Sequence, residues 1–508
     1  MTPPPRASTP GIPFWAWAAL PLLAGAWLRL RDIGDLEPFA DEGALILTAI
    51  DLKVRAIMEP VAQGRPALLW LFAPAGWFPA HALEVARLMS AAAGLATMAA
   101  LGWTLHLLAG RKAALCGLWL WAVLPFAVLH ERLALQDPFI AALLAWAVAL
   151  MVRGSLPGRP AGAWWFGGAG GLFGLACLFK ISALLALPWL GLLYFAAQRH
   201  WARPVFSRGL AGIALGALGP LLCLIPSLIQ LSDRRAQFGF LPSVTAGNYW
   251  PLAMQRLQMW GGWYGGYGGW PLGLLVVGAL LLAARGRSRL ALTAALGSIL
   301  SVAVAALVHN RPFARYVLPD QVPLVLFLSL AWAAGLAVPG RMRAITATLT
   351  MLAVARWGWV SRQIGTDPRH AAVPAGEIEQ YVTGPWSGSG LNEVRRFLAE
   401  YADQHGVTCV VLTHRYFRPG CYGLMLAALA DPRLAIVPFT VYEPEELALA
   451  RRGLQQAAAG HRTACFILYE GSLYPAHPWL DAAGSPARRV HDAPHSPGDR
   501  FTLYQFEP

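Results

Sequence analysis

Long apolar runs constrain the fold of this chain more than any other feature of its sequence. A helix needs about 20 mainly apolar residues to cross a bilayer, and eleven stretches approach or exceed that length. They lie near residues 12–30, 84–109, 113–129, 137–152, 162–179, 181–197, 208–231, 270–284, 289–308, 316–338 and 342–360. Hydrophobic residues make up 56% of the 508 and charged residues only 13%, which is too apolar for a soluble protein of this size. We therefore expect a polytopic α-helical membrane protein.

The basic residues between these runs predict an orientation. Lys and Arg alternate between the connections, so that one side of the membrane receives most of them: Arg111 and Lys112, Arg153 and Arg159, the segment 199–208, the segment 285–289, and Arg341 with Arg343. The positive-inside rule makes that side cytoplasmic. The net charge of +13 is explained by topology and by anionic lipid headgroups, so membrane lipids are the expected partner and nucleic acid is not.

Two segments on the opposite side have distinctive compositions. Segment 31–83 contains two apolar pieces, 43–58 and 66–79, that are too short to span and are expected to lie along the membrane surface as helices. Segment 232–269 is predicted to be a loop, and its end is rich in Gly, Trp and Tyr. Those aromatic side chains could stack on a sugar or form an interfacial belt, and the sequence leaves both interpretations open.

The last part of the chain differs in composition from the rest. After residue 360 the chain becomes more charged and richer in Pro and Gly, which predicts a membrane domain over 1–360 and a second domain over 361–508. Short β-branched runs alternate there with a helical pattern at 393–404, and the predicted strands are 407–412, 434–439, 463–469 and 501–506. This alternation is typical of a small α/β domain. The domain has no GxGxxG motif, so nucleotide binding has no support.

Three acidic residues stand at the predicted outer edge of the membrane. Asp41 and Glu42 follow the first apolar run, and Asp137 precedes Pro138 at the start of another. Acids at helix starts often serve only as caps. Two such acidic entries on one face, each near arginines, favour catalysis, so Asp41, Glu42 and Asp137 are the candidate catalytic residues, with Asp41 as the base.

Basic residues near the same edge could bind a phosphate. Only three lysines occur in the chain, and Lys180 ends an apolar run, where general composition does not explain it. Arg65 precedes the second surface piece, and Arg315 with Tyr316 begins another span. Each cation could equally snorkel to the lipid headgroups. Lys180, Arg65, Arg315 and Tyr316 are the candidate phosphate-binding residues.

Metal and disulfide sites are less well supported. His130 and Arg132 are candidate supporting residues, and His130 with the three acids could hold a divalent cation if the loops meet. We expect no essential metal and no cofactor. The six cysteines lack zinc-site spacing. Cys409, Cys421 and Cys465 are expected to be buried small side chains, and one disulfide among them remains an alternative.

The order of these features resembles the GT-C glycosyltransferases of the protein O-mannosyltransferase and lipid A aminoarabinose transferase type, often labelled glycosyltransferase family 39. The resemblance covers roughly residues 20–340. It rests on Asp41-Glu42, Arg65-Pro66, Arg87-Leu88, Arg132 before Asp137, Gly174 to Lys180, and Arg315-Tyr316-Val317-Leu318-Pro319. Many relatives carry lysine where this chain has Arg65, and glycine where it has Ile181.

The resemblance implies a GT-C fold with about 11 to 13 transmembrane helices. It also implies transfer of a sugar from a polyprenyl-phosphate donor to an extracytoplasmic acceptor, with inversion at the sugar carbon. Asp41 would be the catalytic carboxylate, assisted by Asp137, and Arg65 and Arg315 would contact the donor phosphate. The tail looks too small and too unlike a sugar-binding β-trefoil for the eukaryotic protein-mannosylating form, which favours a bacterial inner membrane and an envelope acceptor. The positive-inside rule places the site and the tail on the extracytoplasmic side.

Several functional alternatives remain open at this stage. The acceptor could be a glycolipid, lipid A, a polymer or a protein hydroxyl, and the last would make the chain a protein O-mannosyltransferase. A flippase of lipid-linked saccharides would also need many spans and intramembrane cations, although the internal repeats typical of transporters are not visible. An inactive assembly subunit is a third alternative, against which the retained acids and arginines argue.

Overall fold

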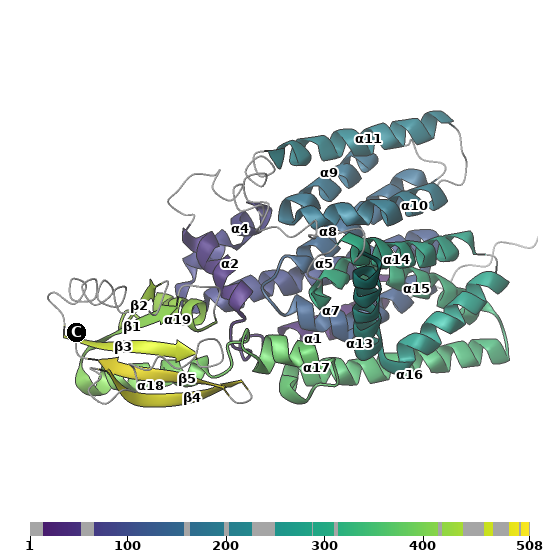
Figure 1. Ribbon diagram of the computed structural model, residues 1–508. Coiled ribbons are helices and arrows are strands. Elements are labelled where there is room, and N and C mark those ends of the chain that lie inside the picture. The colour runs from purple at the N-terminus through teal and green to yellow at the C-terminus, as the bar shows by residue number, and fades with distance from the viewer. Residues whose placement is uncertain are drawn as a thin grey trace, which may run out of the picture.

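Apolar helices form most of the molecule, and a small sheet lies at one end of them (Figure 1). The computed structural model describes residues 14–51, 66–156, 163–197, 203–225, 249–286, 288–308, 313–414, 419–439, 462–470, 487–496 and 499–506. The helices of the bundle are α1 (Phe14–Leu30), α5 (Ala82–Ala109), α6 (Arg111–Val123), α7 (Pro125–Glu131), α8 (Asp137–Ser155), α9 (Ala163–Phe179), α10 (Leu187–Ala197), α11 (Arg203–Leu222), α13 (Tyr249–Arg285), α14 (Arg289–Val308), α15 (Gln321–Ala337) and α16 (Arg341–Thr366).

A helix stands at each of the eleven predicted spans. Among the described residues, five helices are long and apolar enough to cross a membrane, and the bent pair α6–α7 raises the number to six. Shorter apolar helices occupy four more of the predicted positions. The last, α16, is long but carries arginines at 341, 343, 356 and 362. The prediction of a polytopic α-helical membrane protein is confirmed.

Proline residues set the ends of several helices. Pro125 is the first residue of α7, and α6 and α7 meet there at an angle of 58°. Proline has no amide hydrogen to donate to the preceding turn, so the ladder of α6 cannot continue through it. Pro138 stands at the start of α8, where its missing N–H costs nothing. The predicted helix start at Asp137 is therefore confirmed.

The segment between α1 and α5 holds short helices, as the sequence predicts. They are α2 (Ala40–Asp51), α4 (Pro66–Phe72), η1 (Ala73–Trp77) and η2 (Pro79–His81). Residues 52–65 between α2 and α4 lie outside the described part of the chain. Most of α4 is buried against neighbouring elements, so this piece is packed into the protein on one side.

The aromatic segment before residue 270 was wrongly predicted to be a loop. Residues 249–268 are the first part of helix α13. The helical backbone is interrupted at Gly269, which has a φ of 57°, and the helix resumes next to Pro271. Only glycine adopts such a conformation without strain. Trp260 and Tyr267 are buried, whereas Trp250 and Trp270 are exposed. Apolar contacts along the helix outweigh the low helix propensity of its glycines.

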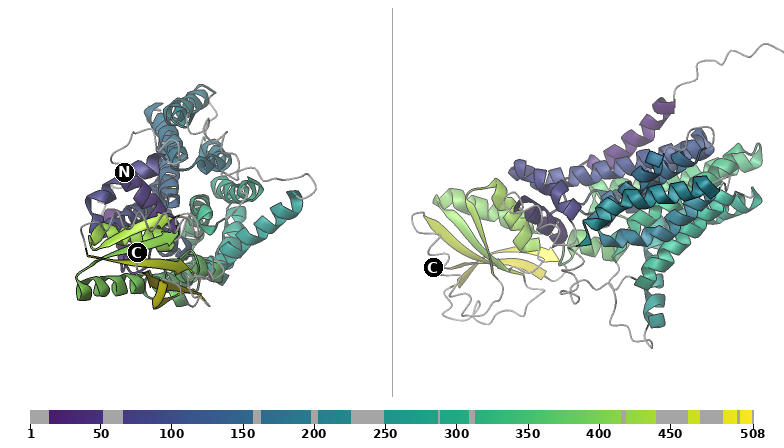
Figure 2. Two further views of the ribbon diagram at one scale, coloured as in Figure 1. Left: turned by 60° about the vertical axis from the view of Figure 1, so that its left-hand side comes forward. Right: turned by 90° about the horizontal axis from the view of Figure 1, so that it is seen from above.

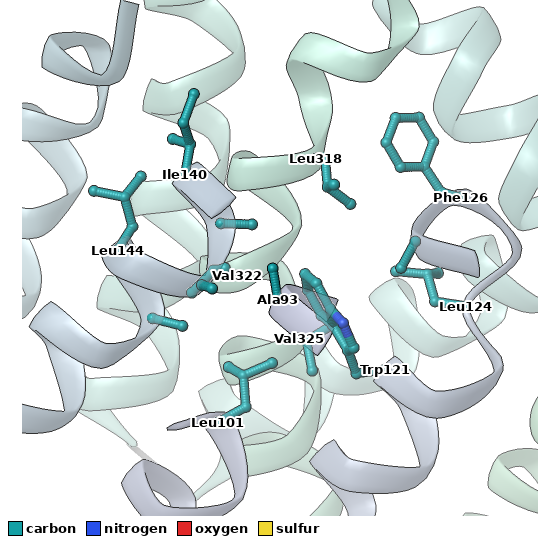
Figure 3. Packing of buried hydrophobic residues seen from close by; sticks show 14 of the residues in the cluster. Ala93, Leu101, Trp121, Leu124, Phe126, Ile140, Leu144, Leu318, Val322 and Val325 are labelled. Atoms are coloured by element: carbon teal, nitrogen blue, oxygen red, sulfur yellow. The ribbon is translucent and has the colours of Figure 1, made fainter. Parts of the chain in front are cut away.

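The bundle core is closely packed around Trp121, whose side chain has no solvent exposure. Figure 3 shows this indole of α6 among Leu101 of α5 and Val322 and Val325 of α15. Small side chains such as Ala93 let the helices approach one another there. The close packing fixes the outer ends of α5, α8 and α15 relative to one another, and the candidate site is built at those ends.

The C-terminal part forms a five-stranded mixed sheet with strand order β2-β1-β3-β5-β4. Its elements are α18 (Leu391–His405), β1 (Thr408–His414), α19 (Pro419–Ala430), β2 (Leu434–Phe439), β3 (Thr463–Glu470), β4 (Ala487–Ser496) and β5 (Asp499–Phe506). Strand β1 runs parallel to β2 and β3, and β5 runs antiparallel to β3 and β4. All four predicted strands and the predicted helix are confirmed.

Helices α18 and α19 pack on one face of this sheet through apolar side chains. Val394 and Leu398 of α18 pack with Val411 and Phe466 of the strands. Strand β4 was not predicted, because its sequence is polar and contains a proline; it pairs only with β5 at the sheet edge, where such residues are tolerated. Cys409, Cys421 and Cys465 are buried free thiols.

The sheet domain is joined to the segment before α2 by hydrogen bonds. The backbone amides of Gly390 and Asn392, at the start of α18, donate to the carboxylate of Glu37 at 2.8 and 2.7 Å. The amide of Ala40 donates to the carbonyl oxygen of Trp386 at 3.1 Å. These bonds hold the loop that leads into α2 against the sheet domain, seen at one end of the bundle in Figure 2.

Helices α9 and α11 pack with almost no space between their backbones. A Cβ atom on Gly216 would overlap the carbonyl oxygen of Gly167, whereas one on Gly219, in the same helix, would meet nothing within 4 Å. We predict that Gly216→Leu forces the two helices apart and destabilises the protein by about 1–3 kcal/mol, the usual cost of overpacking.

The melting temperature of detergent-purified protein measures this effect, with Gly219→Leu as the matched control. Equal melting temperatures for the two variants would show that the contact between α9 and α11 is not required for stability.

Candidate active site

Asp41 lies at the start of α2 and contacts a cation from the other half of the bundle. Its Oδ2 atom is 2.6 Å from Nη2 of Arg315, which belongs to η4 (Ala314–Asp320). The side chain of Asp41 is 24% exposed, whereas that of Arg315 is 6% exposed. Asp41 is thus the acid of the site that reaches open space.

Asp137 lies behind this pair at the first turn of α8. Its side chain is 2% exposed. One oxygen is 3.6 Å from Nζ of Lys180 and the other is 3.9 Å from Nε of Arg315. Lys180 follows the last residue of α9 in an extended conformation, which ends the helix at the site. Asp137 therefore holds two cations side by side.

Aromatic rings complete the environment of the cations. The Nζ atom of Lys180 lies 3.2 Å from the ring centroid of Tyr316, and the guanidinium of Arg315 lies 4.9 Å from that of Phe313 and 5.7 Å from that of Phe39. Rings attract cations through their quadrupole, more strongly where water is excluded. Asp41, Asp137, Lys180 and Arg315 form what we call the four-charge cluster, in which two negative charges balance two positive ones.

A small cavity adjoins the cluster at Asp137 and Tyr316. It has a volume of about 30 Å³, enough for only a few water molecules. The buried side chain of Asp320 also lines it, and its other walls are mostly apolar residues of α8, η3 (Ile181–Ala186) and α14, among them Ile140, Leu144 and Ala305.

Glu42 points away from the cluster. Its carboxylate has no solvent exposure and accepts two bonds of 2.8 Å from the guanidinium of Arg87 on α5. The backbone amides of Phe39 and Ala134 also donate to it, at 3.0 and 2.7 Å. Glu42 is engaged by its neighbours in an arrangement that fixes the start of α2.

His130 and Arg132 lie close to the site without entering the cluster. Arg132 donates to backbone carbonyl oxygens of Leu28, Arg29, Arg31 and Asp32, and so caps the end of α1. His130 is fully buried, with Nε2 at 3.4 Å from an oxygen of Glu377. Arg65 lies outside the described residues, so its predicted role is not tested.

The described residues contain no group of three His, Cys, Asp or Glu side chains placed to hold a metal ion. Lys180 and Arg315 occupy the positions beside the two acids where a cation would otherwise bind. The independence of the reaction from metal stays a prediction.

Comparisons with known proteins agree on the type of protein. Residues 49–238 match the dolichyl-phosphate-mannose-protein mannosyltransferase family. The fold is similar to that of ArnT from Cupriavidus metallidurans in the apo state, with a TM-score of 0.57 and 14% identity over 97% of both chains. The chain is a membrane glycosyltransferase with the GT-C fold.

Two further structures share this fold with the glycosyltransferase. ArnT from Cupriavidus metallidurans bound to undecaprenyl phosphate has a TM-score of 0.57 and 15% identity, over 97% of both chains. The apo oligosaccharyltransferase of Archaeoglobus fulgidus has a TM-score of 0.51 and 14% identity, over 90% of this chain and 69% of its own. No curated protein matches the sequence.

Two buried residues near the candidate site were missed by the sequence analysis. Glu377 lies in α17 (Ala375–Ile378) and Tyr381 in η6 (Glu379–Thr383), between the last bundle helix and the sheet domain. Both are buried. Burial raises the pKa of Tyr381 well above its usual value, so its hydroxyl keeps its proton. This short segment carries no recognisable sequence motif. Its only weak sign of function is a tyrosine that closely follows two glutamates, Glu377 and Glu379.

Because Glu42 and Arg87 are buried together, removing one charge leaves the other uncompensated. We predict that Glu42→Gln costs about 3–5 kcal/mol of stability, the range for breaking a buried ion pair. The melting temperature in detergent should fall clearly. Glu84→Gln, on the same helix as Arg87 but half-buried, is the control and should change it little.

A Glu42→Gln protein with wild-type melting temperature and no transferase activity would instead identify Glu42 as a catalytic group.

Proposed function

We propose that this glycosyltransferase moves a sugar from a polyprenyl-phosphate donor to a hydroxyl acceptor, with inversion at the sugar carbon. The observation that carries the proposal is the position of Arg315, which contacts Asp41 at 2.6 Å and lies beside Asp137, which in turn holds Lys180. A partly exposed base and two cations able to bind a phosphate thus share one site.

The chemistry requires one base and a stabilised leaving group. Asp41 accepts the proton of the acceptor hydroxyl while the acceptor oxygen attacks the anomeric carbon. A new carbon–oxygen bond forms, the bond from that carbon to the phosphate oxygen breaks, and polyprenyl phosphate leaves with the bonding electrons. Lys180 and Arg315 stabilise the charge that develops on the phosphate. No general acid is needed, because the phosphate leaves as an anion.

The pairing of Arg315 with Asp41 links donor binding to the base. When the donor phosphate takes the guanidinium, the carboxylate of Asp41 is released from the 2.6 Å contact that it makes with Arg315 and can face the acceptor hydroxyl. Asp137, which is almost fully buried, keeps both cations in place. Its role is to position Lys180 and Arg315.

The known structures support a lipid-linked donor. ArnT binds undecaprenyl phosphate, and the matching family is named for dolichyl-phosphate-mannose, so both use a polyprenyl carrier. Ile140 and Leu144 place apolar surface beside Asp137 and Tyr316, where a lipid chain attached to the bound phosphate would pack. The sugar carried by the donor is not fixed by these contacts.

The acceptor and the location complete the proposal. Resemblance to ArnT favours a glycolipid, and the family match favours a protein hydroxyl as the second candidate. We place the cluster on the extracytoplasmic side of a bacterial inner membrane, because Arg111, Arg153 and Arg341 lie at the opposite helix ends. The sheet domain, which we assign to residues 361–508, would face the same side as the cluster.

The role of Asp41 is tested by Asp41→Asn, which keeps the shape of the side chain and removes the base. We predict a loss of transfer of about 10²- to 10⁴-fold, compared at equal amounts of folded protein because Arg315 also loses a charge partner. Transfer is measured in proteoliposomes from a panel of radiolabelled undecaprenyl-phosphate sugars, with membrane lipids and peptides as acceptors. Asp35→Asn, an exposed acid six residues upstream, is the matched control.

Equal turnover by Asp41→Asn and Asp35→Asn would remove Asp41 from catalysis. Movement of labelled lipid across the bilayer without any transfer would favour a flippase.

Chelation tests whether a metal takes part. Since Lys180 and Arg315 already neutralise the leaving phosphate, transfer should be undiminished after treatment with EDTA. Activity lost on chelation and restored by one divalent cation would contradict this prediction.

A further inference from the structure

The segment between the bundle and the sheet domain places an unused hydrogen-bond donor beside the four-charge cluster. Tyr381 is 1% exposed, and its hydroxyl has no hydrogen-bond partner among the residues that the structure describes. A buried polar group without a partner is destabilising, and it calls for an explanation.

The position of Tyr381 is fixed by rings on both sides. Its ring lies 4.9 Å from that of Phe39 and perpendicular to that of His130 at 5.7 Å, measured between centroids. The guanidinium of Arg315 lies 5.7 Å from the same Phe39 ring. Tyr381 and Arg315 therefore both lie against the ring of Phe39, two residues before Asp41.

The segment that carries Tyr381 is held from the bundle side. Glu377, one turn earlier, accepts a hydrogen bond of 2.8 Å from the hydroxyl of Tyr267 on α13 and lies 3.4 Å from Nε2 of His130. These contacts come from two helices of the bundle, α7 and α13. Glu377 thus ties the segment that carries Tyr381 to the bundle.

Arg315 also has unused donors at this place. Its Nη2 atom bonds to Asp41, but Nη1 and Nε, both buried, have no hydrogen-bond partner among the described residues. The nearest acid oxygen to Nε is 3.9 Å away, which is beyond a hydrogen bond. Two neighbouring residues therefore offer N–H and O–H donors to an oxygen that the protein itself does not supply.

We propose that Tyr381 binds the phosphate of the lipid-linked donor, donating its hydroxyl hydrogen to a phosphate oxygen next to the guanidinium of Arg315. This inference rests on the proposed function. The hydroxyl is a donor at neutral pH, because burial keeps it protonated. The negative charges of Asp41 and Asp137 also act on this hydroxyl. A phosphate can bind beside it because Lys180 and Arg315 offset the repulsion from the two acids.

The contact would also explain why the segment after α16 is packed into the site. A phosphate bound by Lys180 and Arg315 alone would be held from the bundle only. Tyr381 adds a donor from the side of the sheet domain and so completes the enclosure of the phosphate. Enclosure of this kind excludes water, and it strengthens each charged hydrogen bond.

Direct binding of undecaprenyl phosphate tests the proposal, with undecaprenol, which lacks the phosphate, as the reference ligand. The variant is Tyr381→Phe, which keeps the ring contacts with Phe39 and His130. We expect its Kd for undecaprenyl phosphate to rise about tenfold or more, as for loss of a hydrogen bond to a charged group, and its Kd for undecaprenol to stay the same. A variant that had lost its fold would bind both ligands poorly.

Tyr264→Phe is the matched control, since it removes another buried phenol hydroxyl, one that lines a separate cavity with Leu324 and Trp357. It should bind both ligands as the wild type does. Equal affinity of the wild type and Tyr381→Phe for undecaprenyl phosphate would overturn the role of Tyr381 alone. A wild type that does not prefer undecaprenyl phosphate over undecaprenol would overturn the proposed donor as well.

Discussion

Arg87 and Glu42 form an ion pair in which both side chains are fully buried, and the geometry of the site depends on this pair. Arg87 also donates to the carbonyl oxygens of Ile33 and Leu36, while Glu42 accepts from the amide of Ala134. The pair therefore ties the loop after α1, the start of α2 and the loop before α8 to helix α5. Asp41, which is next to Glu42 in the chain, points the other way and remains available.

Charge balance explains how the cluster persists at the edge of an apolar bundle. An isolated ion in such surroundings is costly, whereas paired ions with further contacts are tolerated. Asp137 is close to both Lys180 and Arg315, and Asp41 supplies the second negative charge. The phosphodiester of the donor carries one negative charge and could replace Asp41 at the cations without exposing them, because the rings of Tyr316 and Phe313 shield their other faces.

The sequence predicted much of this molecule because its strongest signals are local. Runs of apolar residues and β-branched alternation located the helices and four strands. Asp41, Asp137, Lys180, Arg315 and Tyr316 were each found from their position at a span end, and the structure brings these five together. The helical state of residues 249–268 depends on tertiary packing. The engagement of Glu42 and the place of Tyr381 depend on partners 45 residues or more away, which no local pattern reveals.

Glu37 accepts hydrogen bonds from the first turn of α18 and lies four residues before Asp41. A helix start in the sheet domain and the loop that carries the base are thus joined through one carboxylate. An exchange of the sheet domain between related enzymes would have to preserve this match between an acidic side chain and two backbone amides. The C-terminal domain and the loop after the first helix should therefore have changed together during evolution, although about 350 residues separate them.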